Sequence, residues 1–148
     1  MAFVSFTRLH LRAWYYLPAF FVHAARSSAQ AQRSEGFVRG ALSVDVRHLT
    51  SWTVTLWTSE AAMRAYRSAE PHRTAMVKLP TWCDEGSVGH REQPNDEVPT
   101  RDETLRFMQQ HGRLTRVLKP SPGHAAGRTV PDGRAPRFVA TLRPIREK

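Results

Sequence analysis

The 148-residue sequence is poor in cysteine and in acidic residues. Its single cysteine, Cys83, excludes an intramolecular disulfide and a zinc site built from several cysteines, and it fits a reducing cytoplasm. Only 13 Asp and Glu stand against 22 Lys and Arg, so the formal net charge is +9. That charge permits acidic partners without identifying one. The sequence has no P-loop, dinucleotide-binding or nucleophile-elbow motif, so nucleotide cofactors and serine-hydrolase chemistry are unsupported.

The sequence also has no apolar run long enough to cross a membrane. The longest covers residues 13–25 and is interrupted by Pro18 and His23, whereas a bilayer needs about 20 apolar residues. A secretory signal can be read from this run and the Ala29-Gln30-Ala31 sequence behind it. The strand pattern of residues 3–7 and the interrupting proline argue against that interpretation. We therefore expect a cytoplasmic protein with no membrane span.

What the sequence does contain is enough apolar material for a core. Hydrophobic residues make up 41% of the chain, charged residues 24% and aromatic residues 9%. This composition and length are typical of one globular domain. Collagen-like, coiled-coil and wholly disordered structures are excluded.

Four segments have strand patterns. Residues 3–11 carry apolar side chains on both parities, as a strand buried on both faces does. Residues 37–47 and 51–58 alternate between apolar and polar side chains and are separated by a short turn, which predicts an antiparallel hairpin. Residues 87–93 form the fourth candidate strand. Between these segments, Asp84 and Glu85 are expected in a solvated turn.

Helices are predicted between the strands and after them. A first-turn proline starts a helix over residues 18–35. A serine cap starts a second helix at residue 59, which Pro71 restarts or bends and Pro80 stops. A capping box predicts a last helix over residues 100–111.

Residues 119–148 differ from the rest of the chain in composition. They are rich in proline and glycine and carry seven Lys and Arg against two acids. We expect residues 1–118 to form the α+β domain and residues 119–148 to form a basic, mostly extended tail, with residues 137–142 available as a late strand.

The order strand, helix, strand, strand, helix, strand is that of a ferredoxin-like α+β sandwich with an antiparallel sheet. Within it, the block Trp52-Thr53-Val54-Thr55-Leu56-Trp57-Thr58-Ser59-Glu60-Ala61-Ala62-Met63-Arg64-Ala65-Tyr66, followed by Pro71-His72-Arg73-Thr74-Ala75-Met76, resembles a known group. It resembles the dimeric α/β-barrel superfamily of antibiotic-biosynthesis monooxygenases, and most closely an uncharacterised branch and the spheroidene monooxygenase-type proteins. The resemblance covers about residues 3–95.

The resemblance implies a homodimer closed through open sheet faces and a ligand pocket between the sheet and the helices of each subunit. Members include cofactor-free oxygenases of polyketide aromatics, heme-degrading and heme-dependent oxygenases, and lactone isomerases. The cofactor is therefore left open between none and heme. In the heme-degrading branch the ligand histidine aligns with Met76, which speaks against that chemistry here.

His72 is the candidate catalytic residue. It follows Pro71 at the start of a helical segment, near Tyr66. Because the pKa of an unperturbed histidine is near 6.5, His72 could be a general base toward a phenol or enol. It could equally ligate heme iron, or simply pack the start of the helix. No metal-ligand spacing is present elsewhere, so no metal site is predicted.

Four further residues are candidates for contact with a substrate: Trp57, Tyr66, Trp82 and His90. Aromatic rings with a few polar groups suit a flat, conjugated ligand. Trp57 sits on the more polar parity of its strand, which favours a pocket or a dimer interface. Tyr66 offers a hydroxyl, and His90 shares the inward parity of Val88. Core packing is the competing interpretation for the aromatic residues, and a hydrogen-bonded structural histidine is the competing interpretation for His90.

The sequence therefore predicts a monooxygenase-like oxidoreductase acting on a hydrophobic, conjugated small molecule. The alternative is a non-catalytic small-molecule-binding or scaffold protein of the same fold. A third hypothesis is nucleic-acid binding by the basic tail, but its arginines are scattered and Phe138 is its only aromatic residue. A solvated tail, or one draped over a dimer partner, is favoured over that hypothesis.

Overall fold

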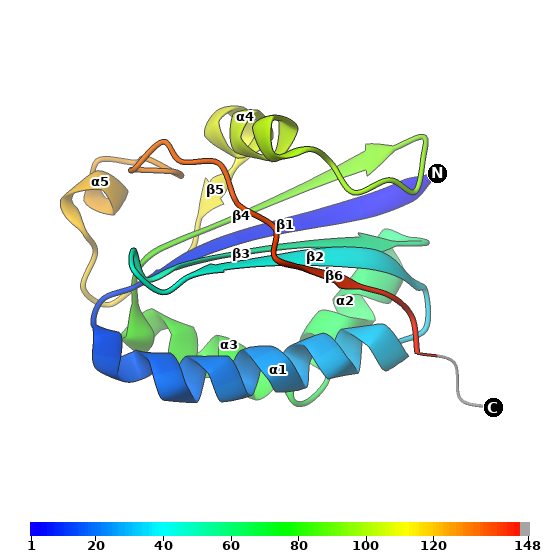
Figure 1. Ribbon diagram of the computed structural model, residues 1–148, viewed down its shortest axis with the longest axis horizontal. Coiled ribbons are helices and arrows are strands. Elements are labelled where there is room, and N and C mark those ends of the chain that lie inside the picture. Colours follow the sequence, from blue (N-terminus) through cyan, green and yellow to red (C-terminus); the bar gives the residue numbers. More distant parts are fainter. Residues whose placement is uncertain (146–148) are drawn as a thin grey trace.

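The computed structural model describes residues 1–145 and has helices on both sides of one sheet (Figure 1). The six strands follow the spatial order β5-β4-β1-β3-β2-β6, and every neighbouring pair is antiparallel. The elements in chain order are β1 (Ala2–Leu11), the 3-10 helix η1 (Trp14–Tyr16), α1 (Leu17–Arg33), β2 (Phe37–Asp45), β3 (Thr50–Trp57), α2 (Glu60–Ser68), α3 (His72–Trp82), β4 (Cys83–Gln93), α4 (Arg101–His111), β5 (Arg113–Leu114), α5 (Pro122–Ala125) and β6 (Ala140–Leu142).

The four long strands and the helices between them confirm the ferredoxin-like α+β class. The central strand β1 pairs with β3 on one side and β4 on the other. Its side chains are buried on both faces, as its apolar residues on both parities predict: Phe3 packs in one core cluster, while Val4 and Phe6 pack in another. The predicted hairpin is present as β2 and β3.

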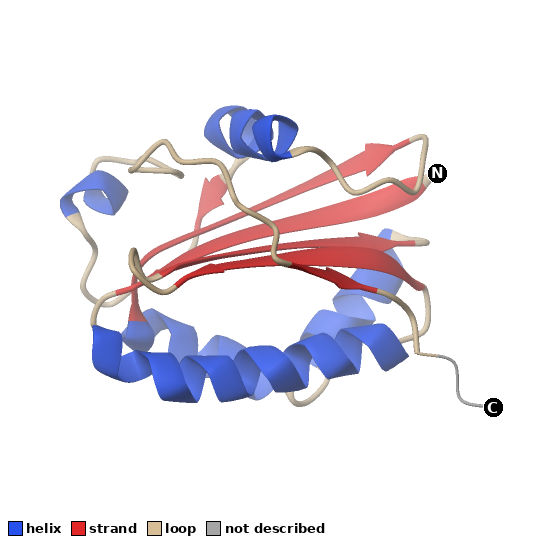
Figure 2. Ribbon diagram, in the orientation of Figure 1, coloured by secondary structure: helices blue, strands red, loops and turns tan. Residues whose placement is uncertain are grey.

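One face of the sheet is covered by α1, α2 and α3 (Figure 2). Ser59 caps α2 by accepting a hydrogen bond from the main-chain N–H of Ala62, as its position before the helix predicts. Met63 and Ala31 contact Phe3 and Trp57 in the core between this helix layer and the sheet. The layer therefore holds three of the residues predicted to carry chemistry, Tyr66, His72 and Trp82, whereas Trp57 lies on β3 and His90 on β4.

The other face of the sheet is covered by α4 and by the segment that follows it. Thr100 caps α4 as predicted, and Phe107 of α4 lies against Phe6 of β1, with ring centroids 4.7 Å apart. Val130, from the predicted tail, is 7% exposed and belongs to the same core cluster. Of the predicted late strand, residues 140–142 pair with β2 as β6. Residues 146–148 lie outside the described residues.

Two expectations for the region around residues 80–87 were wrong. Helix α3 continues past Pro80 to Trp82, because a proline in the last turn removes only one hydrogen bond near the helix end. Strand β4 starts at Cys83 rather than residue 87. Asp84 and Glu85 therefore lie in a strand and not in a solvated turn, and Glu85 is buried. Among the helices of residues 1–145, none is long and apolar enough to cross a membrane.

Candidate functional site

A row of four contacting rings crosses from the sheet to the helix layer. Phe37 of β2 contacts Trp57 of β3, Trp57 contacts Tyr66 of α2, and Tyr66 contacts His72 at the start of α3. The ring centroids are 5.3, 5.0 and 4.6 Å apart in that order. The structure thus brings together three of the five predicted site residues. It places His72 at the end of the row that is not built into the sheet.

The ring of His72 is held in one tautomer by the main chain. Its Nδ1 lies 3.2 Å from the carbonyl oxygen of Arg67. Because a carbonyl only accepts hydrogen bonds, Nδ1 carries the hydrogen and Nε2 keeps its lone pair. Burial lowers the pKa of His72, and the charge of Arg67 lowers it further against the opposing effect of the carbonyl. At neutral pH the imidazole is therefore uncharged and can accept a proton at Nε2.

Gln30 of α1 fixes the joint between α2 and α3 on which His72 sits. Its Oε1 accepts the main-chain N–H of His72 at 2.8 Å. Its Nε2 donates to the carbonyl oxygens of Tyr66 at 3.0 Å and Ala69 at 3.3 Å. One side chain thus ties three main-chain groups of the joint to the neighbouring helix.

Tyr66 is a half-buried, neutral phenol. Its hydroxyl donates to the carbonyl oxygen of Ser27 at 3.1 Å, and burial raises its pKa. The hydroxyl already has a main-chain partner, so the ring face of Tyr66 is what it offers to His72. Tyr66 acts here as a support and is no candidate base.

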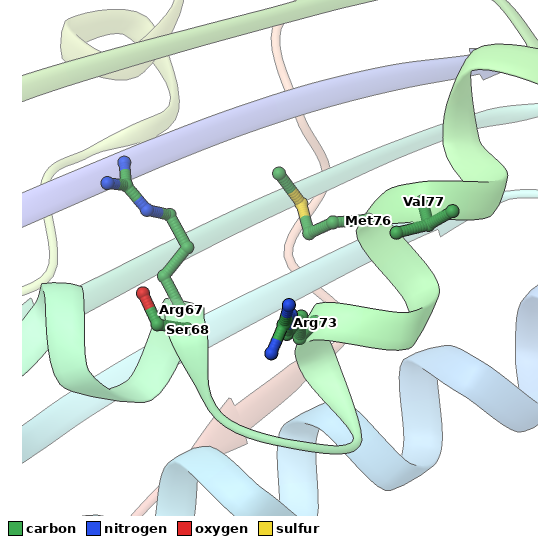
Figure 3. A pocket seen from close by; sticks show the side chains of 5 residues that line it. All are labelled: Arg67, Ser68, Arg73, Met76 and Val77. Carbon is green, nitrogen blue, oxygen red and sulfur yellow. The ribbon is translucent and has the colours of Figure 1, made fainter.

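A shallow hollow of about 470 Å³ opens beside this row, at the junction of α2 and α3. Figure 3 shows Arg67 on the α2 side of it and Met76 on the α3 side, with Arg73 below Met76 near the start of α3; the other lining residues are Ser68 and Val77. The lining thus carries two guanidinium groups and no carboxylate. Within residues 1–145, Arg67 has no carboxylate within ion-pair distance. This charge suits a ligand with an anionic or developing anionic oxygen.

His90 lies on the face of β4 that is turned toward α1, α2 and α3, and its parity predicts this inward position. Its ring stacks on Phe3, with centroids 5.6 Å apart and planes 19° apart. Burial lowers its pKa most, followed by the charges of Arg113 and Arg67. Arg67 therefore acts on both His72 and His90, although the described residues show no hydrogen bond between the two histidines.

Trp57 and Trp82 do not line this hollow. Trp57 has no exposed surface, and its Nε1 donates to Thr55 Oγ1 at 2.9 Å, so it supports Tyr66 from behind. Trp82 ends the helix that His72 begins, which separates their Cα atoms by about 15 Å. It contacts His23, with ring centroids 5.3 Å apart. The contacts of these two tryptophans are those of core packing.

Sequence reasoning missed Arg67 and Gln30. Arg67 follows Tyr66 directly and precedes His72 by five residues, and this spacing was the available signal. Gln30 has no such signal, because it lies in a polar run some 40 residues from the groups that it binds. Its role depends on the packing of α1 against α3.

A histidine-ligated heme does not fit the hollow. Its lining includes no histidine, and Met76 stands where the resemblance places the ligand. Within the described part of the chain, one other group of metal-ligating side chains lies together, formed by His10, Asp84 and Glu85. His10 Nδ1 is already 2.5 Å from Asp84 Oδ1, and Glu85 accepts from Arg8 and Ser121. His10 and Asp84 are thus paired with each other, and Glu85 is paired with Arg8 and Ser121.

No protein-family model and no curated protein matches the sequence. Solved structures do match. SnoaB, a cofactor-independent oxygenase from Streptomyces nogalater, is 19% identical over 67% of this chain and 98% of its own, with a TM-score of 0.52. A protein from Mycobacterium tuberculosis is 12% identical over 67% of this chain and 100% of its own, with a TM-score of 0.56. A structure described as an antibiotic biosynthesis monooxygenase is 13% identical over the same shares, with a TM-score of 0.55.

Identities this low carry the fold and not the chemistry. The aligned two thirds of the chain matches nearly the whole of each of these structures. The chain therefore has the ferredoxin-like α+β fold found in antibiotic biosynthesis monooxygenase-like proteins.

Proposed function

We propose that this protein is a cofactor-free, monooxygenase-like oxidoreductase that acts on a hydrophobic, conjugated small molecule with an acidic C–H or O–H group. The observation that carries the proposal is the uncharged, oriented imidazole of His72, held on Tyr66 with its Nε2 able to accept a proton. The likeness to SnoaB, a cofactor-independent oxygenase, supports the reaction class.

In this proposal His72 Nε2 removes the acidic proton and Arg67 stabilises the resulting enolate or phenolate oxygen. The electron-rich carbanion then reacts with dioxygen. For an activated methylene group, one dioxygen converts CH₂ to C=O; the second oxygen atom leaves as water with both hydrogens. The substrate supplies the electrons, so no external reductant is required. The protein contributes deprotonation, charge stabilisation and orientation.

The proposal is tested with anthrone, a flat conjugated molecule with an acidic methylene group. We expect the full-length protein to accelerate its conversion to anthraquinone, with one dioxygen consumed per molecule. His72→Gln keeps a donor for the Arg67 carbonyl but lacks the base, so the rate should fall about 100-fold or more. Arg67→Ala should also lower it, whereas His111→Gln, on α4 across the sheet, should not. Full activity in His72→Gln would contradict the role of His72.

Hemin titration of the same protein distinguishes the two cofactor hypotheses. Because Met76 stands where the resemblance places the ligand histidine, we expect no saturable Soret band. A stoichiometric band that disappears in His72→Ala would contradict the cofactor-free proposal and place His72 as an iron ligand.

The second candidate is a small-molecule-binding protein without catalysis. The absence of histidine from the lining of the hollow favours it, because a ligand held there would contact arginine and methionine and no base. Saturable binding of anthraquinone with no acceleration of anthrone oxidation would establish this alternative.

The predicted homodimer stays a proposal. The sheet face through which it was expected to form is covered by α4 and residues 119–142.

A further inference from the structure

Large apolar side chains are exposed along the outer side of η1 and the first half of α1. Trp14 is 72% exposed, Tyr15 57%, Phe21 41% and Val22 48%. Residues 14 and 21, and residues 15 and 22, are each seven positions apart, which is two helical turns. These four residues, called the α1 stripe, therefore share one side of the segment.

The core does not require the α1 stripe. The residues of α1 that are buried against the sheet and the other helices are Phe20 and Ala31. Figure 1 shows α1 along the outer side of the molecule, and within residues 1–145 the four side chains of the α1 stripe stay exposed. Exposed aromatic residues gathered in this way mark a contact surface rather than ordinary surface variation.

The charge around the α1 stripe has one sign. The sequence contains no Asp or Glu from Met1 to Ser34, while Arg12, Arg26 and Arg33 fall in that range. Arg26 is exposed and lies one turn after Val22. Helix α3, which packs beside α1, adds the exposed Lys78. The apolar side chains are thus flanked by cations alone within this segment.

We propose that the α1 stripe docks this protein onto an anionic lipid surface. Tryptophan and tyrosine favour the boundary between lipid headgroups and acyl chains, and arginine and lysine beside them attract anionic headgroups. A second copy of this chain paired symmetrically through the same surface would bring like charges together with no acid in residues 1–34 to compensate. The protein would lie on the bilayer, since none of the described helices can span it.

The test is co-sedimentation of the full chain with vesicles of phosphatidylcholine alone and with vesicles that contain 30% phosphatidylglycerol. We expect binding to the anionic vesicles that weakens as salt rises. Replacing both Trp14 and Tyr15 with Ser should weaken the partitioning about tenfold or more. Val46→Ser/Val139→Ser is the matched control, because these exposed valines lie outside the stripe; this control should bind as wild type does.

Tryptophan fluorescence gives a second readout that depends on location. Trp52 and Trp57 are buried and Trp14 is the most exposed tryptophan, so vesicle binding should shift the emission to the blue, and the Trp14→Phe variant should lose most of that shift. Equal binding to both kinds of vesicle, or binding to neither, would overturn the proposal. So would a dimer in sedimentation velocity that dissociates in Trp14→Ser/Tyr15→Ser, since it would assign the stripe to a second copy. None of these outcomes depends on anthrone oxidation.

Discussion

At the scale of single residues, the chemistry of His72 is set by what surrounds it. A solvated histidine is partly protonated near pH 6.5 and exchanges between tautomers. Here burial and the Arg67 charge favour the neutral form, and the Arg67 carbonyl selects the tautomer. The neutral ring and this tautomer together leave a lone pair on Nε2 that can accept a proton, as a general base requires.

The pKa of His72 predicts the pH dependence of activity. The folded-state pKa lies below the ordinary value of 6.5, so His72 stays neutral down to a lower pH than a solvated histidine. The rate of anthrone oxidation should therefore rise with pH along a limb whose midpoint is below 6.5 and be level at neutral pH. A rate profile at several pH values, with the His72 ring titration followed by NMR, checks this. A midpoint above 6.5 in either measurement would contradict the burial argument.

The same linkage affects stability. Because the folded pKa of His72 is depressed, the unfolded state binds more protons just below pH 6.5. Stability is therefore fully present above pH 6.5 and is lost as pH falls toward the folded pKa. His90 shifts in the same direction, so the two histidines act together in this window.

Residue-level prediction from the sequence succeeded where neighbours in the chain decide the outcome. His72 and Tyr66 do lie together, because one follows the other across a short turn between two helices. It failed where distant contacts decide. Trp82 is in the same helix as His72 yet at its far end. The charge of Arg67 acts on the pKa of His90 because the fold brings β4 near α2.

At the scale of elements, the joint between α2 and α3 determines where His72 stands. The joint consists of residues 69–71, and its main chain is tied to α1 through Gln30. Without that side chain, the N–H of His72 would need another partner, whereas the carbonyls of Tyr66 and Ala69 would keep the main-chain N–H groups of Ala69 and Arg73. Gln30 is thus a positioning residue for His72.

Replacing Gln30 with Ala should loosen the joint while leaving the sheet intact. Lost side-chain hydrogen bonds of this kind cost about 0.5–1.5 kcal/mol each, so we expect lower stability and faster hydrogen exchange at the His72 amide. Gln32→Ala is the matched control, because Gln32 donates instead to the carbonyl of Arg143, near the C-terminus. Unchanged exchange at His72 in Gln30→Ala would contradict the role of Gln30. Anthrone oxidation should fall in Gln30→Ala and not in Gln32→Ala.

Elements were predictable where local pattern and capping agree. The alternation of residues 37–47 and the Ser59 and Thr100 caps predicted the hairpin and two helix starts that the structure contains. The start of β4 was not predictable in this way. Asp84 and Glu85, near its start, have the sequence pattern of a solvated turn, because the arginine that pairs with Glu85 is 77 residues away.

At the scale of the whole molecule, the segment after α4 packs on one face of the sheet and shields it from solvent. Arg8 of β1 is 1% exposed and donates to Glu85 at 2.8 Å, and its second guanidinium nitrogen lies 3.4 Å from Asp132. Glu85 also accepts from Ser121 at 2.7 Å. The buried pair thus connects the sheet to the basic segment at two points. Composition alone described that segment as a tail, because its contacts are long-range and its residues are polar.

Because the segment after α4 shields the apolar residues of that face from solvent, these residues are buried without a second subunit. Val130 belongs to the cluster formed by Val4, Phe6 and Val54, so a charge at this position would sit in the core or force the segment off the sheet. Since burying an unpaired carboxylate is the costlier outcome, we expect Val130→Asp to release the segment. The exposed sheet face should then bind the dye ANS and drive self-association, seen by sedimentation velocity. Val139→Asp, at a side chain that is 72% exposed, should change neither. If Val130→Asp bound no more ANS than Val139→Asp and sedimented as a species of the same size, the segment would not be what shields this face. The pairing of two open sheets would then be the better explanation of how this face is buried.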